Sequence, residues 1–243
     1  MKLSRRIRQA LLRRLLPIPV QARHVEYSVL CSADDERAVP TPRLIDTALE
    51  AIRHAQQVSM DALCARMPGP PHYPNVWPGE NYKLLAGLML AVKPQLVVEV
   101  GTGGGTSTLA LLGSMPAGSK LVTFDVVGWQ AYPEAMLKSD DFDDGRLVQY
   151  VGDVSQPDAF ARYQTWFEQA DFVFIDAAKD GVMEFRLLER FQSIRFPKVP
   201  LMAFDDIRLW NMLRFWRSLA CPKLDLTSFG HWCGTGLVEW RRG

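Results

Sequence analysis

The sequence is short of cysteine, of long hydrophobic runs and of net charge, and each shortage excludes a class of protein. The cysteines form no CxxC pair, which excludes the usual zinc-ribbon spacing and favours reduced thiols in a cytoplasmic protein over a disulfide scaffold. They are Cys31, Cys64, Cys221 and Cys233. No run of about 18 apolar residues occurs, so no membrane-spanning helix is predicted. With 243 residues, 48% of them hydrophobic, the chain can bury a core in one or two domains.

The net charge of +1 hides an uneven distribution. Seven of the 28 basic residues and none of the 27 acidic residues lie in residues 1–23, which leaves residues 24–243 with a net charge of −6. Affinity for nucleic acid comes mainly from neutralised phosphates, so this acidic body argues against a nucleic-acid partner.

Residues 1–23 form a basic arm. Leucine or isoleucine recurs every four residues among its arginines, which predicts a short amphipathic helix that ends before Pro17. Residues 1–20 either attach to an anionic membrane surface or form a loose or subunit-contacting arm. We expect the protein to be a homo-oligomer.

Helices and strands alternate along most of the remaining chain. Thr41 followed by Pro42 predicts a helix start, and a proline-rich connector at 67–79 closes an N-terminal helical cap over 24–79. From residue 80 a helix at 80–92 leads to strands at 96–100, 121–125, 147–151, 172–175, 201–204, 224–229 and 236–240. This order predicts an α/β fold, with a Rossmann-like, doubly wound, mostly parallel seven-stranded sheet in a domain over 80–243. In such sheets ligands bind beyond the carboxyl ends of the strands.

The first predicted strand runs into a glycine-rich turn. The pattern E-x-G-x-G-x-G spans Glu99 to Gly105, and Thr106 stands where a dinucleotide fingerprint would have its last glycine. The second strand ends at Asp125, whose two carboxylate oxygens could accept from both ribose hydroxyls of a nucleoside. Asp153 follows the third strand and could accept from an exocyclic amine of adenine.

Carboxylates also end the next two strands. Asp176 and Lys179 belong to a D-A-A-K-D sequence after the fourth strand, and Asp205 and Asp206 follow the fifth. Adjacent parallel strands bring these three acids to one edge, where like charges repel unless a cation neutralises them. Mg²⁺ or another divalent cation bound by Asp176, Asp205 and Asp206 is therefore predicted.

The chain from about residue 75 to 243 resembles the class I S-adenosylmethionine-dependent methyltransferases in its glycine turn, Asp125 and Gly152-Asp153. The resemblance implies that S-adenosylmethionine binds there, with Asp125 on the ribose and Asp153 on the adenine edge. The residues that it places around the methionine part are Glu99, Gly101, Gly103 and Ser107.

The acidic sequences are similar to those of the catechol and caffeoyl-CoA O-methyltransferases. In that branch the fourth strand ends in D-x-x-K-D and the fifth in D-N, so Asp176 and Asp205 match its metal ligands and Lys179 its lysine. Asp206 departs from the pattern, because it replaces the asparagine; paired aspartates occur in related sugar- and antibiotic-tailoring methyltransferases. The resemblance implies metal-assisted transfer of a methyl group to a hydroxyl of a small molecule, with Asp176 and Lys179 as catalytic residues.

Other functions remain compatible with the sequence. A methyltransferase of the same fold could act on RNA through the basic arm, and a methyltransferase-like protein could bind its ligand without turnover. An NAD-dependent oxidoreductase fits less well, because Thr106 breaks the fingerprint and no Tyr-x-x-x-Lys accompanies the acids. His231, between the last two predicted strands, is a further candidate base.

Overall fold

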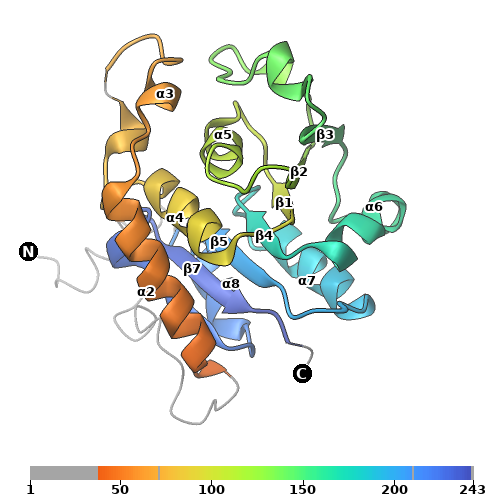
Figure 1. Ribbon diagram of the computed structural model, residues 1–243. Coiled ribbons are helices and arrows are strands. Elements are labelled where there is room, and N and C mark those ends of the chain that lie inside the picture. The colour runs from red at the N-terminus through yellow and green to blue at the C-terminus, as the bar shows by residue number, and fades with distance from the viewer. Residues whose placement is uncertain (1–37, 71, 210, 242–243) are drawn as a thin grey trace, which may run out of the picture.

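A seven-stranded sheet forms the centre of the molecule (Figure 1). The computed structural model describes residues 38–70, 72–209 and 211–241. In spatial order the strands are β3 (Leu147–Val151), β2 (Lys120–Asp125), β1 (Leu96–Val100), β4 (Phe172–Ile175), β5 (Leu201–Asp205), β7 (Thr235–Glu239) and β6 (Lys223–Asp225). Only β7 runs antiparallel to its neighbours β5 and β6. The predicted mostly parallel, doubly wound sheet is confirmed.

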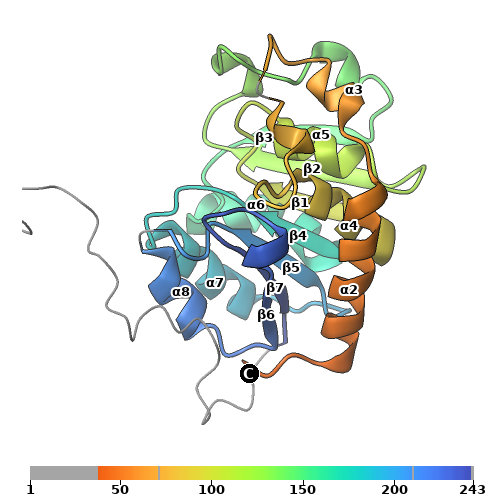
Figure 2. The same cartoon turned by 90° about the vertical axis from the view of Figure 1, so that its left-hand side faces the viewer.

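Helices cover both faces of this sheet (Figures 1 and 2). On one face lie α2 (Pro42–Gln57), α4 (Tyr82–Val92) and α5 (Thr106–Leu112); on the other lie α6 (Pro157–Gln169), α7 (Met183–Ser193) and α8 (Met212–Ser218). Successive strand residues point to opposite faces, so Val97 packs in the core of the first face and Val98 in that of the second. Burial on both faces explains why these strands are almost wholly apolar.

The predicted start of α2 is confirmed in detail. The Thr41 hydroxyl oxygen accepts a hydrogen bond from the Leu44 backbone N–H at 3.1 Å, and Pro42 begins the helix. The same hydroxyl donates to Glu239 on β7 at 2.7 Å. This contact ties the start of α2 to the sheet, and α2 then lies along α4 (Figure 2).

Two predicted elements differ from the structure. The helix predicted from residue 80 begins at Tyr82, because the backbone of Gly79 pairs with Gly230 and Trp232. The strand predicted over 224–229 is limited to β6, and a 3₁₀ helix, η6 (Thr227–Phe229), follows it. The Asp225 carboxylate accepts from both the N–H and the hydroxyl of Thr227, a local bond that competes with strand pairing.

Short elements connect the main ones. They are α3 (Asp61–Cys64), η3 (Tyr73–Asn75), η4 (Trp129–Ala131) and η5 (Ser139–Phe142). The predicted basic arm and residues 24–37 of the predicted cap lie outside the described residues. Within the part of the chain that the structure describes, no helix combines the length and apolarity needed to cross a membrane.

Candidate functional site

A cavity of about 580 Å³ opens at the carboxyl ends of β1, β2, β3 and β4. The order of the strands reverses between β1 and β4, which is where doubly wound sheets bind ligands. The cavity is lined by the glycine turn 101–107, by Asp125 and Asp153, and by residues 176–180. Of the predicted site residues, Glu99, Asp205, Asp206 and the candidate base His231 are not in this lining.

Gly101 sets the distance between the glycine turn and Asp176. Its φ of 104° lies in a region that side chains disfavour, and a Cβ there would lie 1.9 Å from the Asp176 carbonyl oxygen. Only glycine lets the ends of β1 and β4 approach this closely. The turn that begins the cavity and the first predicted metal ligand are thereby held side by side.

Asp125 is held at the end of β2 by the glycine turn itself. Its Oδ2 accepts from the Gly103 backbone N–H at 2.8 Å, and its Oδ1 from the Val127 N–H at 3.3 Å. The Tyr132 hydroxyl lies 3.4 Å from Oδ2. Each carboxylate oxygen can accept further bonds, so Asp125 presents an oriented acceptor to the cavity.

Asp153 is held in a similar way after β3. Its Oδ1 accepts from the N–H and the hydroxyl of Ser155 at 3.0 and 2.7 Å, and its Oδ2 from the Gln156 amide at 3.0 Å. Burial on its own would raise the pKa of Asp153, but these bonds outweigh it and lower the pKa. Asp153 is therefore an ionised acceptor at the cavity wall.

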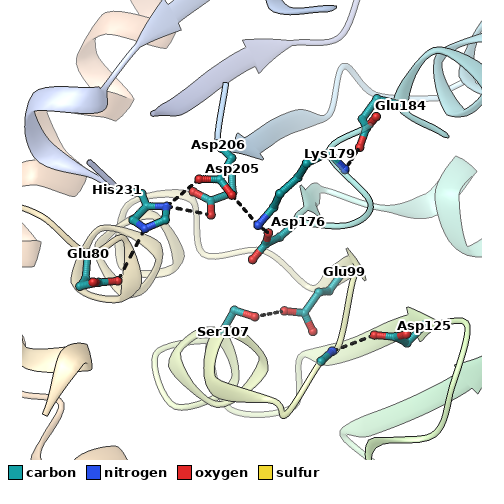
Figure 3. Close-up of polar contacts among 11 residues, drawn as sticks. Glu80, Glu99, Ser107, Asp125, Asp176, Lys179, Glu184, Asp205, Asp206 and His231 are labelled. Carbon is teal, nitrogen blue, oxygen red and sulfur yellow. Dashed lines mark hydrogen bonds and ion pairs between the residues drawn. The ribbon is translucent and has the colours of Figure 1, made fainter. Parts of the chain in front are cut away.

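Glu99 lies behind the cavity. Its carboxylate is fully buried and accepts from three hydroxyls, those of Ser107 (2.7 Å), Thr108 (2.5 Å) and Thr123 (2.7 Å). Burial raises its pKa to about 7 against the effect of these bonds. The bonds join β1 to α5 and β2 and orient Ser107 (Figure 3). The contact of Glu99 with a cofactor stays a prediction. In the structure its carboxylate holds Ser107, which lines the cavity.

The three predicted metal ligands lie together beside the cavity. Asp176, Asp205 and Asp206 can place one oxygen each within 4.8 Å of one another. Asp205 and Asp206 are 3% and 2% exposed. Asp206 also adopts a φ of 56°, a left-handed conformation that aspartate visits more readily than most non-glycine residues.

Lys179 lies between two of these carboxylates (Figure 3). Its ammonium is 2.9 Å from Asp176 Oδ1 and forms an ion pair with Asp206. Burial would lower the pKa of Lys179, but the two carboxylates outweigh burial and raise it. Burial and then Asp205 raise the pKa of Asp176 to about 7, although Lys179 opposes the change.

His231 contacts the cluster from the opposite side (Figure 3). Its Nδ1 is 2.9 Å from Asp206 Oδ1 and 3.3 Å from Asp205 Oδ2, and its Nε2 is 3.9 Å from a Glu80 oxygen. Burial would lower the pKa of His231, but hydrogen bonds to Asp205 and Asp206 outweigh it and raise the pKa to about 10. Among the described residues, Lys179 and His231 are the cationic side chains paired with these three carboxylates.

The residues fit a divalent cation. Oδ1 of Asp205 is buried and has no hydrogen-bond partner among the described residues. A buried carboxylate oxygen of this kind costs free energy unless something binds it. Three carboxylates also provide the hard oxygen ligands that such an ion prefers. The structure thus brings together the residues predicted to bind metal, and their role as ligands stays a prediction.

Sequence analysis missed several residues of the site. Tyr132 and Arg186 line the cavity. Cys233 lies close enough to Asp206 and His231 to share an ion with them, and the spacing His-x-Cys was the available signal for it. Burial and the Asp206 and Asp205 carboxylates raise the pKa of the Cys233 thiol to about 12.

Comparisons with known proteins give structural similarities only. No protein-family model matches the chain, and no curated protein matches it. It is similar to an O-methyltransferase from Bacillus cereus in complex with SAH, with 18% identity over 79% of this chain and 90% of that chain and a TM-score of 0.49. A methyltransferase from Geobacter sulfurreducens shows 18% identity over 97% of both chains, with a TM-score of 0.47. An SAH-bound methyltransferase from Podospora anserina shows 15% identity over 99% of this chain and 98% of that chain, with a TM-score of 0.45. The strand order and directions described above, rather than these similarities, establish the fold.

Proposed function

We propose that this protein transfers a methyl group from S-adenosylmethionine to a hydroxyl of a small molecule, assisted by a divalent cation. One observation carries the proposal. A single cavity has nucleoside-compatible acceptors at successive strand ends, and it reaches the wall where Asp176 and Lys179 join the carboxylate cluster. The proposed cofactor site and the proposed site of oxygen activation are therefore adjacent.

The cavity suits S-adenosylmethionine in size and in chemistry. Its volume of about 580 Å³ lies in the range of small-molecule sites. A Cβ at Gly103 would meet nothing within 4 Å, so the turn leaves open space where a cofactor chain could lie against the backbone. Asp125 would accept from the ribose, Asp153 from the adenine, and the turn with Ser107 would surround the methionine part.

The chemistry needs an electrophilic methyl group and an activated oxygen. S-adenosylmethionine supplies the methyl group: the new O–CH₃ bond forms as the S–CH₃ bond breaks, and the electron pair of that bond goes to sulfur. A divalent cation held by Asp176, Asp205 and Asp206 would lower the pKa of the acceptor hydroxyl and orient it. The fixed positions of the cavity and the cluster would supply the alignment that an in-line displacement requires.

The proton of the hydroxyl must leave as the bond forms. Asp176 and Lys179 are the groups of this cluster that also line the cavity, so the proposal assigns proton transfer to them. While Lys179 is paired only with Asp176 and Asp206 it keeps its proton, because these two carboxylates raise its pKa. It would act as a base only when cation binding to those carboxylates weakens its two ion pairs.

The test combines ligand binding with methyl transfer. Calorimetry with S-adenosylmethionine, and with NAD as the control ligand, should show binding of the first only. Incubation with S-adenosylmethionine that carries an isotopically labelled methyl group, over a panel of hydroxylated metabolites, should transfer the label to oxygen. Activity should disappear with EDTA and return on adding a divalent salt.

Three results would contradict the proposal in different ways. Binding of NAD without S-adenosylmethionine would refute the cofactor. Label transferred to RNA and to no small molecule would refute the acceptor class. Undiminished transfer after exhaustive chelation would refute the metal and leave metal-free transfer.

A further inference from the structure

The turn before β7 brings two metal-binding residue types to the carboxylate cluster. β5 and β7 pair antiparallel with Asp205 opposite Thr235, so the residues after β5 lie beside those before β7. The Arg208 N–H donates to the Cys233 carbonyl at 2.9 Å and fixes this arrangement. A Cβ at Gly234 would lie 2.9 Å from the Arg208 nitrogen, so glycine is required for the two segments to approach.

Asp206, His231 and Cys233 consequently surround one point. An oxygen of Asp206, a ring nitrogen of His231 and the Cys233 sulfur can all lie within 4.8 Å of one another. Asp206 and Cys233 are 2% and 7% exposed, so both are shielded from water. Beside them is the buried Asp205 Oδ1, which has no hydrogen-bond partner within the described chain.

The three ligand types differ in the ions they select. Mg²⁺ binds oxygen ligands and retains water, and a thiolate is a poor ligand for it. Sulfur together with imidazole and carboxylate suits ions such as Zn²⁺ and Co²⁺, which bind nitrogen and sulfur more strongly. The cysteine and the histidine therefore change the preference of the cluster from a hard ion to a borderline one.

We propose that Asp206, His231 and Cys233, with Asp205 beside them, bind a divalent transition-metal ion such as Zn²⁺ in preference to Mg²⁺. The inference rests on the proposed function in one respect, the presence of a divalent ion at this edge of the sheet. It differs in the ligands: nitrogen and sulfur from the turn before β7 join the carboxylates. Asp206 belongs to both ligand sets, and the proposal assigns one ion to the combined set.

Cobalt is the probe that distinguishes these ligand sets, since a cysteine thiolate bound to Co²⁺ adds charge-transfer absorption in the near ultraviolet. The full chain, stripped of metal and titrated with Co²⁺ under reducing conditions, should show this absorption. Excess Mg²⁺ should not displace the ion, and Zn²⁺ should. Cys233→Ser should lose the band and weaken Zn²⁺ binding about 100-fold or more, because losing even a residue that only orients a ligand costs about 10- to 100-fold.

Cys221→Ser is the matched control. Cys221 is also buried and unpaired with another cysteine, but it bonds the Arg241 carbonyl at the other end of the sheet, so its variant should keep the band. His231→Gln should weaken Zn²⁺ binding while leaving Mg²⁺ binding within a few fold. These readouts do not depend on methyl transfer.

The outcomes separate this inference from the proposed function. Co²⁺ binding by the wild-type chain without a thiolate band overturns the mixed site and leaves a carboxylate site for the proposed reaction. Equal Zn²⁺ affinity in Cys233→Ser and wild type overturns it as well. Failure to bind any divalent ion overturns both the mixed site and the metal assistance. Binding of S-adenosylmethionine, measured separately, then decides whether the proposed cofactor stands.

Discussion

Asp125 shows how one side chain serves both the turn and a ligand. It accepts from Gly103 at 2.8 Å and faces the cavity, so Asp125→Ala should weaken S-adenosylmethionine binding in a folded protein. Losing such hydrogen bonds costs about 1–3 kcal/mol, or about ten- to a hundredfold in affinity. Calorimetry measures the change, and Asp143→Ala, an exposed aspartate outside the cavity lining, is the control of equal charge. Unchanged affinity in folded Asp125→Ala would remove this residue from the site.

The paired aspartates should differ in what they tolerate. Asp205→Ala should abolish turnover and leave S-adenosylmethionine affinity within a few fold, because the proposed cofactor contacts lie on other strands. Asp206→Asn should be milder, since asparagine keeps an oxygen ligand and accepts the left-handed φ of 56°. Steady-state turnover and calorimetry on both variants test this difference. An active Asp205→Ala protein would contradict the metal role.

Glu99 should make the stability of the protein depend on pH. Burial raises its pKa from an ordinary 4.5 to about 7, so the folded chain keeps a proton that the unfolded chain releases. This contribution to the free energy of unfolding is fully present below pH 4.5 and is lost as the pH rises through about 7. Glu99→Gln, which cannot ionise, should lose that part of the dependence. Denaturant unfolding at about pH 5 and about pH 8 measures the free energy of unfolding of both proteins. An equal change in that free energy between the two pH values for wild type and Glu99→Gln would contradict the prediction.

At the scale of elements, an ion pair connects the cap to residues 136–141, a segment that contacts the glycine turn. Arg66, just after α3, donates to both oxygens of Asp141 at 2.6 and 2.7 Å and to the Met136 carbonyl at 3.1 Å. Met136 and Leu137 in turn donate to the Gly104 carbonyl at 2.7 and 3.3 Å. The contacts transmit the position of the cap to the wall of the cavity.

Arg66→Ala should therefore loosen residues 136–141 more than the molecule as a whole. A half-buried bidentate pair contributes roughly 1 kcal/mol, so stability should fall modestly. Hydrogen exchange at the Met136 and Leu137 amides should accelerate, and S-adenosylmethionine affinity should drop several fold. Lys198→Ala, which breaks an exposed pair with Asp171 at the far end of β4, should change neither. Unaltered exchange at Met136 would show that the pair does not hold the segment.

The strands were predictable because burial on both faces makes them apolar runs, and their ends therefore located Asp125, Asp176 and Asp205. The start of α2 was predictable because Thr41-Pro42 acts locally. The approach of Cys233 to Asp206 was not predictable: the spacing His-x-Cys relates Cys233 only to His231, and its place beside Asp206 depends on the antiparallel register of β5 and β7. The burial of Glu99 was missed for a related reason, since its three hydroxyl partners come from α5 and β2.

At the scale of the whole molecule, the charge separates a basic N-terminal stretch from an acidic body. Residues 1–23 hold seven basic and no acidic side chains, whereas residues 24–243 carry −6. Because the arm is basic and the body acidic, any affinity of the full chain for nucleic acid or a membrane would come from the arm and would weaken with salt. If the body binds its cofactor without the arm, truncation would separate this affinity from cofactor binding.

A chain that starts at Val25 should fold and bind S-adenosylmethionine as tightly as the full chain. Among the described residues, the cavity lining begins at Tyr82, and the Thr41 hydroxyl holds the start of α2 to Glu239. Glu239 is further paired with Arg241 at 3.0 Å, so this end of the sheet has its own contacts. Calorimetry on both chains, with thermal unfolding to establish folding, measures the comparison. A folded short chain that no longer binds S-adenosylmethionine would mean that residues 1–24 complete the site, from the same subunit or from a neighbouring one. Mixing the short chain with full-length Asp125→Ala chains would then restore binding only if the arm acts between subunits.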